Sequence, residues 1–495
     1  MRSSKVAALM AVVMAAAAGT GCTVGPDFVR PQVEAPAGWR IDYPQAAEVA
    51  NTKWWQQFGD PVLDSLIETA LRDNLDVRTA AARIDQFLGV LTATNSQAYP
   101  QLGYGGGVAR TRASREGVPP IPEPANNYFT VYQGSLNASW QIDLFGRVRR
   151  MSEAAQAQVY ASQQAQRGVV LTLVAGVATS YIALRALDRQ LEIANSTAAN
   201  FGETARIFDL RFRSGLVSQT EVNQIRSQYQ QARTAIPSFE QQIAAVENQL
   251  SILLGRDPGP IPRGKTIDQL LVPLIPAGLP SELLERRPDI LAAEQALVAA
   301  NANIGAARAQ YYPSLSLTGA LGSTSDSFSH FLTGPATTWS VAAGLVGPIF
   351  TFGAIEGQVR SAEAGRAQAE LAYRQTVLGA FRDANNALVG VQKSGEGVEF
   401  QRERVRALRE FARLSHLKFE AGLIGYLEVL IADNELFAAE LSEVNLQAAR
   451  YSQSVAVYQA MGGGWVDLAD GMTQRPVGAA GAAAGNAANN VAKTP

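Results

Sequence analysis

The stretch YFTVYQGSLNASWQIDLF, residues 128–145, alternates apolar and polar side chains over more than ten positions. One face carries Tyr132, Leu136, Ala138, Trp140, Ile142 and Leu144, and the other carries Gln133, Ser135, Asn137, Ser139, Gln141 and Asp143. A period of two is typical of a β-strand, and one fully apolar face is typical of a transmembrane β-strand. An amphipathic strand on the core of a soluble protein would show the same alternation, so the stretch alone leaves both alternatives open.

Three further stretches repeat this pattern more weakly, at residues 102–112, 315–324 and 339–350. They predict four strands in two hairpins. A single-chain membrane barrel needs at least eight strands, and an open sheet in lipid would leave unpaired backbone groups at its edges. If these strands lie in a membrane, several subunits must therefore pool them into one barrel.

Each hairpin is followed by a long proline-free segment with helix-favouring composition, at about residues 147–213 and 354–419. At 1.5 Å per residue, each helix would be about 100 Å long. Both segments end at a Gly-Leu pair, Gly215-Leu216 and Gly422-Leu423, and a return helix follows each. Long helical hairpins of this kind predict coiled-coil-like packing, of which a purely structural rod is one form.

The chain contains two copies of one unit. DLFGRV (143–148) corresponds to FTFGAI (350–355), and RFRSGLVSQTEV (211–222) corresponds to KFEAGLIGYLEV (418–429), each 207 residues later. We predict a first repeat over residues 61–255 and a second over 280–465, each with a helix, a β-hairpin and a long helical hairpin. A link at 256–279 joins them, and a low-complexity tail occupies 466–495.

The link contains GPIPRGKT (259–266), which fits the phosphate-binding loop motif of nucleotide hydrolases. That loop needs backbone N–H donors, a preceding strand and a following helix. Here Pro260 and Pro262 each remove a donor, and the preceding residues read as the end of a helix. We therefore predict that the motif is fortuitous and that the protein is not an enzyme.

The N-terminus predicts a signal peptide at residues 1–21. Arg2 and Lys5 precede 13 apolar residues, which end in Gly19-Thr20-Gly21-Cys22. Small residues before the only cysteine are typical of a bacterial lipoprotein box, in which Cys22 is acylated, although such boxes usually carry Leu where Gly19 stands. The alternative is a soluble export signal with an incidental cysteine. No later run of 18 or more apolar residues occurs, so we expect no transmembrane helix.

Composition excludes several kinds of function. The net charge is −2, so no excess of basic residues indicates nucleic-acid binding. Two histidines and one cysteine leave almost no ligands for a metal site of the His/Cys type. His416 falls within a helical pattern and is interpreted as an ordinary surface histidine.

The chain resembles the TolC-like outer membrane factors, specifically the OprM/NodT-type lipoprotein branch. Four motifs carry the resemblance: CTVGPDFVRP (22–31), WQIDLFGRVRR (140–150), FRSGLVSQTEV (212–222) and GLPSELLERRPDI (278–290). The resemblance covers about residues 20–465. It implies a membrane α/β composite, in which a homotrimer forms a 12-stranded outer-membrane β-barrel above a 12-helix periplasmic tunnel.

The resemblance also implies a function and partners. The protein would be the passive outer-membrane channel of a tripartite efflux system, working with a periplasmic adaptor and an inner-membrane RND pump. It would need no cofactor beyond acyl lipids on Cys22, in a lipidated extension at 22–60. An exit duct for type I polypeptide secretion shares these features and differs in its pump, and a periplasm-spanning scaffold would conduct nothing.

Two sites are expected at the helix tips. The adaptor-docking surface is proposed as Gly215, Leu216, Val217, Gly422, Leu423 and Ile424. The gate candidates are Glu428, Ile431, Asp433 and Glu435, since the family often places Asp where this chain has Ile431. An acidic constriction compensated by arginines such as Arg226 is one hypothesis, and an apolar closure by Leu427, Leu430 or Ile431 is the other.

Overall fold

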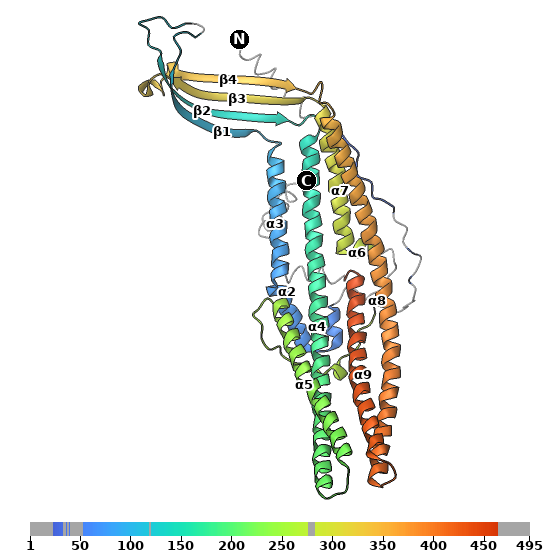
Figure 1. Ribbon diagram of the computed structural model, residues 1–495. Coiled ribbons are helices and arrows are strands. Elements are labelled where there is room, and N and C mark those ends of the chain that lie inside the picture. The colour runs from blue at the N-terminus through green and yellow to red at the C-terminus, as the bar shows by residue number, and fades with distance from the viewer. Residues whose placement is uncertain are drawn as a thin grey trace, which may run out of the picture. The chain divides into compact units, whose positions relative to one another are not determined.

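The computed structural model describes residues 23–32, 36, 39, 53–117, 120–275 and 283–463 (Figure 1). These residues belong to two compact units. The sheet unit comprises the chain up to Pro31, Asp85–Ala161 and Ala293–Tyr373, and the helical unit comprises Gln32–Ile84, Ser162–Ala292 and the chain from Arg374. The predicted signal peptide, Cys22 and the low-complexity tail lie outside the described residues.

The sheet unit contains one antiparallel sheet with the strand order β1-β2-β3-β4. Its strands are β1 (Gln101–Arg112), β2 (Tyr128–Ile142), β3 (Ser314–Ser325) and β4 (Thr337–Val346). All four predicted strands are present. The fourth was predicted to reach residue 350, but it ends at Val346, before Gly347 and Pro348. Proline has no N–H to donate to a neighbouring strand, which accounts for the earlier end.

The strand register places most of the large apolar residues of the four strands on one face. Tyr104, Leu136, Leu321 and Trp339 are successive cross-strand neighbours and form one row across the sheet. The next row, on the opposite face, is Gly105, Ser135, Gly322 and Thr338. The four apolar side chains are between 56% and 89% exposed, so most of this face is uncovered by the described part of the chain.

The helices follow the same order in the two halves of the chain. The first half has α2 (Pro61–Asp73), α3 (Leu75–Ser96), α4 (Arg147–Arg213) and α5 (Gln219–Leu253), and the second has α6 (Leu283–Arg286), α7 (Pro288–Arg308), α8 (Ala354–Glu420) and α9 (Tyr426–Ala460). The long helices α4 and α8 have 67 residues each, and the return helices α5 and α9 have 35 each. Pro237 lies inside α5, and buried Val444 stands 207 residues later in α9.

Two apolar cores lie among the described residues of the helical unit. The larger core joins α2, α4, α5 and α9 to the link, and in it Trp54 stacks on Tyr458 with ring centroids 4.9 Å apart. The smaller core lies near the hairpin turns, where Phe208 of α4, Phe419 of α8 and Tyr426 of α9 pack together. Aromatic packing of this kind holds helices from the two halves of the chain against each other.

One part of α4 is long and apolar enough, by length and composition, to cross a membrane. Small and polar residues interrupt it, so it was not recognised as an apolar run in the sequence. In the structure, 67% of this part is buried inside the protein. The core helix of a soluble protein meets the same criterion, and the burial accounts for the apolar composition of α4.

Candidate functional site at the helix tips

The two hairpin turns have the same backbone geometry. After α4, Gly215 has a φ of 70°, and the N–H of Leu216 donates to the carbonyl of Arg211 at 2.9 Å. After α8, Gly422 has a φ of 74°, and the N–H of Leu423 donates to the carbonyl of Lys418, also at 2.9 Å. Each is a left-handed C-cap, in which glycine avoids the strain that a Cβ would cause.

The residues after each glycine divide into two kinds. Leu216 and Leu423 project into solvent and are each 74% exposed. Val217 and Ile424 are partly buried against the smaller core and hold the turn in place. The structure therefore brings all six predicted docking residues to the two turns, and it leaves the two leucines accessible to a partner.

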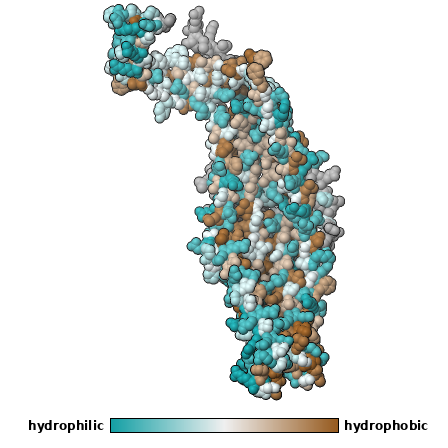
Figure 2. Space-filling model, in the orientation of Figure 1, coloured by the Kyte–Doolittle hydropathy of each residue, from teal (hydrophilic) through white to brown (hydrophobic). Residues whose placement is uncertain are grey.

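The two tips differ in hydropathy. Figure 2 shows hydrophobic residues gathered at the tip of α8 and α9, whereas the tip of α4 and α5 is largely hydrophilic. Leu423, Leu427 and Ile431 are exposed at the α8–α9 tip. In the other repeat, the positions of Leu427 and Ile431 are taken by Thr220 and Gln224. The similar turns therefore present different surfaces.

The gate candidates fall on two faces of α9. Glu428, Ile431 and Glu435 are exposed on one face, because residues three or four apart lie together on a helix. Asp433 is half-buried and faces α8. Leu430, which the apolar hypothesis included, is buried in the smaller core and is not available in this chain to close a pore.

Asp433 is paired with His416 of α8, whose Nε2 lies 3.0 Å from each carboxylate oxygen. The pair lies in a groove of about 610 Å³ whose wall also includes Asn200 and Glu203 of α4. Burial raises the pKa of Asp433 above its ordinary value near 3.8, although the neighbouring imidazole acts in the opposite direction. His416 was interpreted from the sequence as an ordinary surface residue, and that interpretation missed this contact.

The first hairpin contains an ion pair at the corresponding position. Arg226 of α5 donates to Asp209 of α4 at 2.9 Å. These two residues precede Asp433 and His416 by 207 positions. Arg226 was expected to compensate the gate carboxylates, but in this chain it binds Asp209. Each hairpin therefore carries a polar pair at this position, with the acid on opposite helices.

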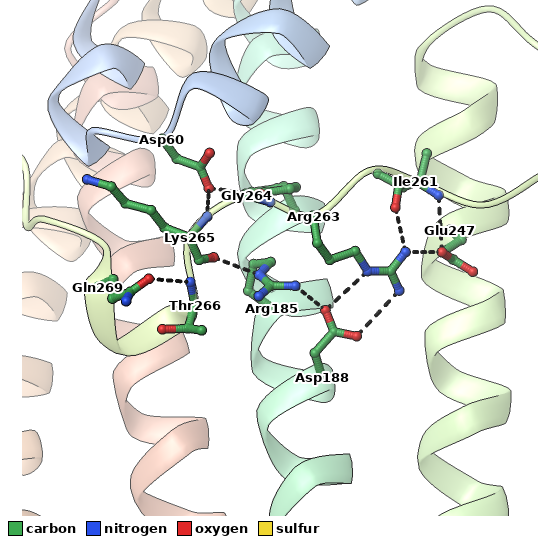
Figure 3. A network of polar contacts seen from close by, with 11 residues as sticks. Asp60, Arg185, Asp188, Glu247, Ile261, Arg263, Gly264, Lys265, Thr266 and Gln269 are labelled. Atoms are coloured by element: carbon green, nitrogen blue, oxygen red, sulfur yellow. Dashed lines mark hydrogen bonds and ion pairs between the residues drawn. The ribbon is translucent and has the colours of Figure 1, made fainter.

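The phosphate-loop motif takes part in a structural contact in the link (Figure 3). Asp60, which caps α2, accepts the N–H of Lys265 at 2.9 Å and the hydroxyl of Tyr181 at 2.7 Å. The N–H of Gly264 donates to the same hydroxyl at 2.9 Å. A Cβ at Gly264 would lie 2.0 Å from the Asp60 carboxylate. The donors that a phosphate would need are occupied by the protein itself.

Ionic contacts hold the same loop against two helices. Arg185 of α4 donates to the carbonyl of Lys265 at 2.8 Å and also binds Asp188. Arg263 binds Asp188 of α4 and Glu247 of α5 (Figure 3). The link thereby connects α4 and α5 through charge-assisted hydrogen bonds, which are the stronger kind. In the part of the chain that the structure describes, no group of three or more His, Cys, Asp or Glu residues could hold a metal ion.

Comparison with known proteins identifies the family. The model of the outer membrane efflux protein family matches residues 66–256 and 279–463, which is most of the chain. The chain belongs to the outer membrane efflux protein family. It is therefore an outer-membrane channel of tripartite efflux with a periplasmic tunnel, a transport conduit and not an enzyme.

Relatives with different named substrates are equally similar in sequence. The chain is 32% identical over 461 residues to the toluene efflux pump outer membrane protein TtgF of Pseudomonas putida, covering 91% of this chain and 95% of the relative. It is also 32% identical over 452 residues to the cation efflux system protein CusC of Escherichia coli, covering 90% and 96%.

A solved structure shares the fold. The MtrE outer membrane channel of Neisseria gonorrhoeae in its open state superposes with a TM-score of 0.80, at 30% identity, over 90% of this chain and 99% of that one. The mostly helical fold with a small sheet is therefore that of an outer-membrane efflux channel.

Proposed function

We propose that three copies of this chain form a 12-stranded barrel above a 12-helix periplasmic tunnel. The observation that carries the proposal is the row of exposed apolar side chains across one face of the sheet. In the described sheet, β1 and β4 each pair on one side only. Because lipid cannot satisfy open strand edges, β1 of one copy must pair with β4 of another if this face lies in a membrane.

Exposed apolar residues on α8 support assembly with further copies. Leu378, Phe400 and Phe411 all lie in the helical unit and are exposed, with Phe400 at 75%. A long helix packed among neighbours buries its apolar positions, and here no other part of the described chain covers them. Neighbouring copies in the trimer would bury these side chains.

We propose that Cys22 is acylated after removal of residues 1–21. Cys22 itself lies outside the described residues, but the chain directly after it is fixed to the sheet unit. The N–H of Val24 donates to the carbonyl of Phe145 at 3.2 Å, and Asp27 pairs with Arg150 at 2.8 Å. An acyl chain on Cys22 would thus begin close to the end of β2. Intact-protein mass spectrometry tests this, and an unmodified Cys22 would contradict it.

The adaptor would dock at the exposed leucines of the turns. Leu216 and Leu423 offer apolar anchors, and helices commonly recognise partners through such side chains in a groove. The adaptor and the inner-membrane RND pump belong to this proposal, as does the expectation that the link at 256–279 helps form an equatorial domain packed around the tunnel. The domain boundaries predicted from the sequence remain predictions as well.

Closure would take place on the exposed face of α9. Threefold symmetry would bring three copies each of Glu428, Ile431 and Glu435 toward one axis. Like charges confined there repel unless cations or arginines compensate. We propose that Asp433 serves this gate indirectly, by pairing α9 with α8 through His416.

The cargo is proposed to be drugs or other small molecules, since the relatives named above are named for toluene and for cations. Planar-bilayer recording of the purified protein tests the duct. Stable single-channel currents would support the proposal. Expression of the protein should also restore drug resistance to a strain that lacks its own outer-membrane channel. Insertion without conductance would favour a scaffold, and rescue of polypeptide secretion alone would favour the type I exit duct.

A further inference from the structure

Two arginines lie at the end of β1 on the apolar face of the sheet. Arg110 and Arg112 are cross-strand neighbours of Thr130 and Tyr128, which belong to the same face as Leu136. Their guanidinium carbons lie 5.9 Å and 5.6 Å from the centre of the Tyr128 ring. Contact with one ring confirms that both arginines project from this face. Both arginines lie at the end of β1 that leads into the β1–β2 loop.

Neither arginine forms an ion pair with a carboxylate in the described part of the chain, whereas Arg115 in the adjacent loop pairs with Glu123 at 2.7 Å. Residues two apart on a strand lie about 7 Å apart on one face. Two guanidinium groups at that spacing can share one phosphate, and guanidinium is the side-chain group best suited to phosphate recognition. The positive charge is therefore available for an anion.

An apolar groove lies further along the same face. The segment between β3 and β4 folds over the sheet, so that Phe331 covers Gly134, where a Cβ would lie 2.8 Å from the ring. The hydroxyl of Ser323 donates to the carbonyl of Phe331 and fixes the segment. The groove holds about 430 Å³, and Leu136 and Leu321 line its floor.

The arginines and the groove are separated by a distance that fits a lipid. From the level of Arg110 to the level of Leu136 is six residues of β2, or about 20 Å. One leaflet of a bilayer contributes about 15 Å of hydrocarbon. A headgroup at the arginines would therefore place its acyl chain over Gly134 and Leu136. Tyr132 lies at a level between the arginines and Leu136 and packs against Phe328, with ring centroids 5.8 Å apart, in the manner of the aromatic girdle at a membrane interface.

We propose that this surface binds a phosphate-bearing lipid of the outer leaflet, with the phosphate between Arg110 and Arg112 and an acyl chain in the groove beneath Phe331. This inference rests on the proposed function, because only a membrane-spanning sheet places the arginines at the outer interface. Pairing of β1 with a neighbouring copy would leave both side chains on the outward face.

Native mass spectrometry of the detergent-solubilised trimer can test the site, with lipid A and enzymatically dephosphorylated lipid A as probes. Wild-type protein should retain lipid A and prefer it over the dephosphorylated form. The double variant Arg110→Ala/Arg112→Ala should bind lipid A about tenfold or more weakly, as expected from the loss of two basic residues at a membrane surface. Phe331→Ala should weaken binding of both probes, because it opens the groove.

The control is Arg115→Ala, which removes an arginine from the same end of the sheet and should retain wild-type affinity. Inorganic phosphate at millimolar concentration should not displace lipid A, since it lacks the acyl chain. Equal affinity in the double variant, equal loss in the control, or displacement by phosphate would each overturn the lipid site. If the wild-type protein forms conducting trimers but shows none of these preferences, the lipid site fails while the proposed function stands. A wild-type protein that neither assembles nor conducts overturns both.

Discussion

The imidazole of His416 and the carboxylate of Asp433 join α8 to α9 at the position where Asp209 and Arg226 join α4 to α5. The acid is on the long helix in the first hairpin and on the return helix in the second. The first pair joins a carboxylate to a guanidinium group, and the second joins a carboxylate to an imidazole ring. The two hairpins are therefore held at this position by different side-chain chemistry.

Asp433→Asn should change how stability depends on pH. Because burial raises the pKa of Asp433, the folded state holds the proton more tightly than the unfolded state. The stability of the wild type relative to the variant should therefore be greatest below about pH 4 and fall as pH rises through the raised pKa. Thermal melting of the solubilised trimer across acidic pH measures this. In a His416→Gln background the fall should be larger, and a difference that grows with pH would contradict the assignment.

Glu428→Ala should raise the basal conductance of single channels or change their cation selectivity. In the proposed trimer, this variant removes three exposed carboxylates near the axis and so alters the electrostatics of the closed tip. Glu410→Ala is the matched control, because Glu410 is exposed on α8 and pairs with Arg413. If Glu428→Ala behaves like wild type while Ile431→Ala opens the channel, closure is apolar.

Leu423→Asp should weaken binding of the periplasmic adaptor about tenfold or more, since a charge replaces an exposed apolar anchor. Leu216→Asp should also weaken it, but less, because the α4–α5 tip offers fewer apolar neighbours (Figure 2). Ser214→Asp introduces the same charge beside the turn and should have little effect. Biolayer interferometry with the adaptor measures all three, and equal binding by all of them would exclude docking through these leucines.

Val341→Arg should impair membrane assembly far more than Ala342→Arg. Val341 belongs to the apolar face of β4, and Ala342 to the opposite face. A charge facing lipid near the bilayer centre costs about 2–4 kcal/mol, whereas a charge in a barrel lumen is solvated. Heat-resistant trimer in the outer-membrane fraction is the measurement. Equal yields would refute the membrane assignment. Trp140 is less suitable, because its indole N–H bonds to Ala98 outside the sheet, near a strand end.

Lys265→Ala should leave assembly unchanged, because the backbone N–H of Lys265, not its ammonium group, binds Asp60. Neither the wild-type protein nor this variant should bind nucleotide. Gly264→Ala should destabilise the protein by about 1–3 kcal/mol, since its Cβ would overlap Asp60. Isothermal titration with ATP and chemical denaturation measure the two effects. Measurable ATP affinity that Lys265→Ala abolishes would revive the phosphate-loop interpretation.

The sequence predicted the elements that local patterns determine. The period of two in residues 128–145 gave β2, and the glycines at 215 and 422 gave the turns. Contacts between distant residues were not predictable, because no local pattern records them. Asp60 directly before Pro61 is an ordinary N-cap signal for α2. Its contact with Lys265, 205 residues later, has no such local signal. Predicting that His416 pairs with Asp433 requires knowing which residues of α8 and α9 face each other in the hairpin, and the sequence alone does not define this.

Pro237 makes the two hairpins mechanically unequal. It removes one N–H from the middle of α5, whereas α9 has Val444 at the corresponding place and keeps its backbone bond. Bending α5 there breaks one hydrogen bond fewer than bending α9 by the same amount. The first hairpin is thus the more compliant of the two, and a force applied equally at both turns would deflect α5 first.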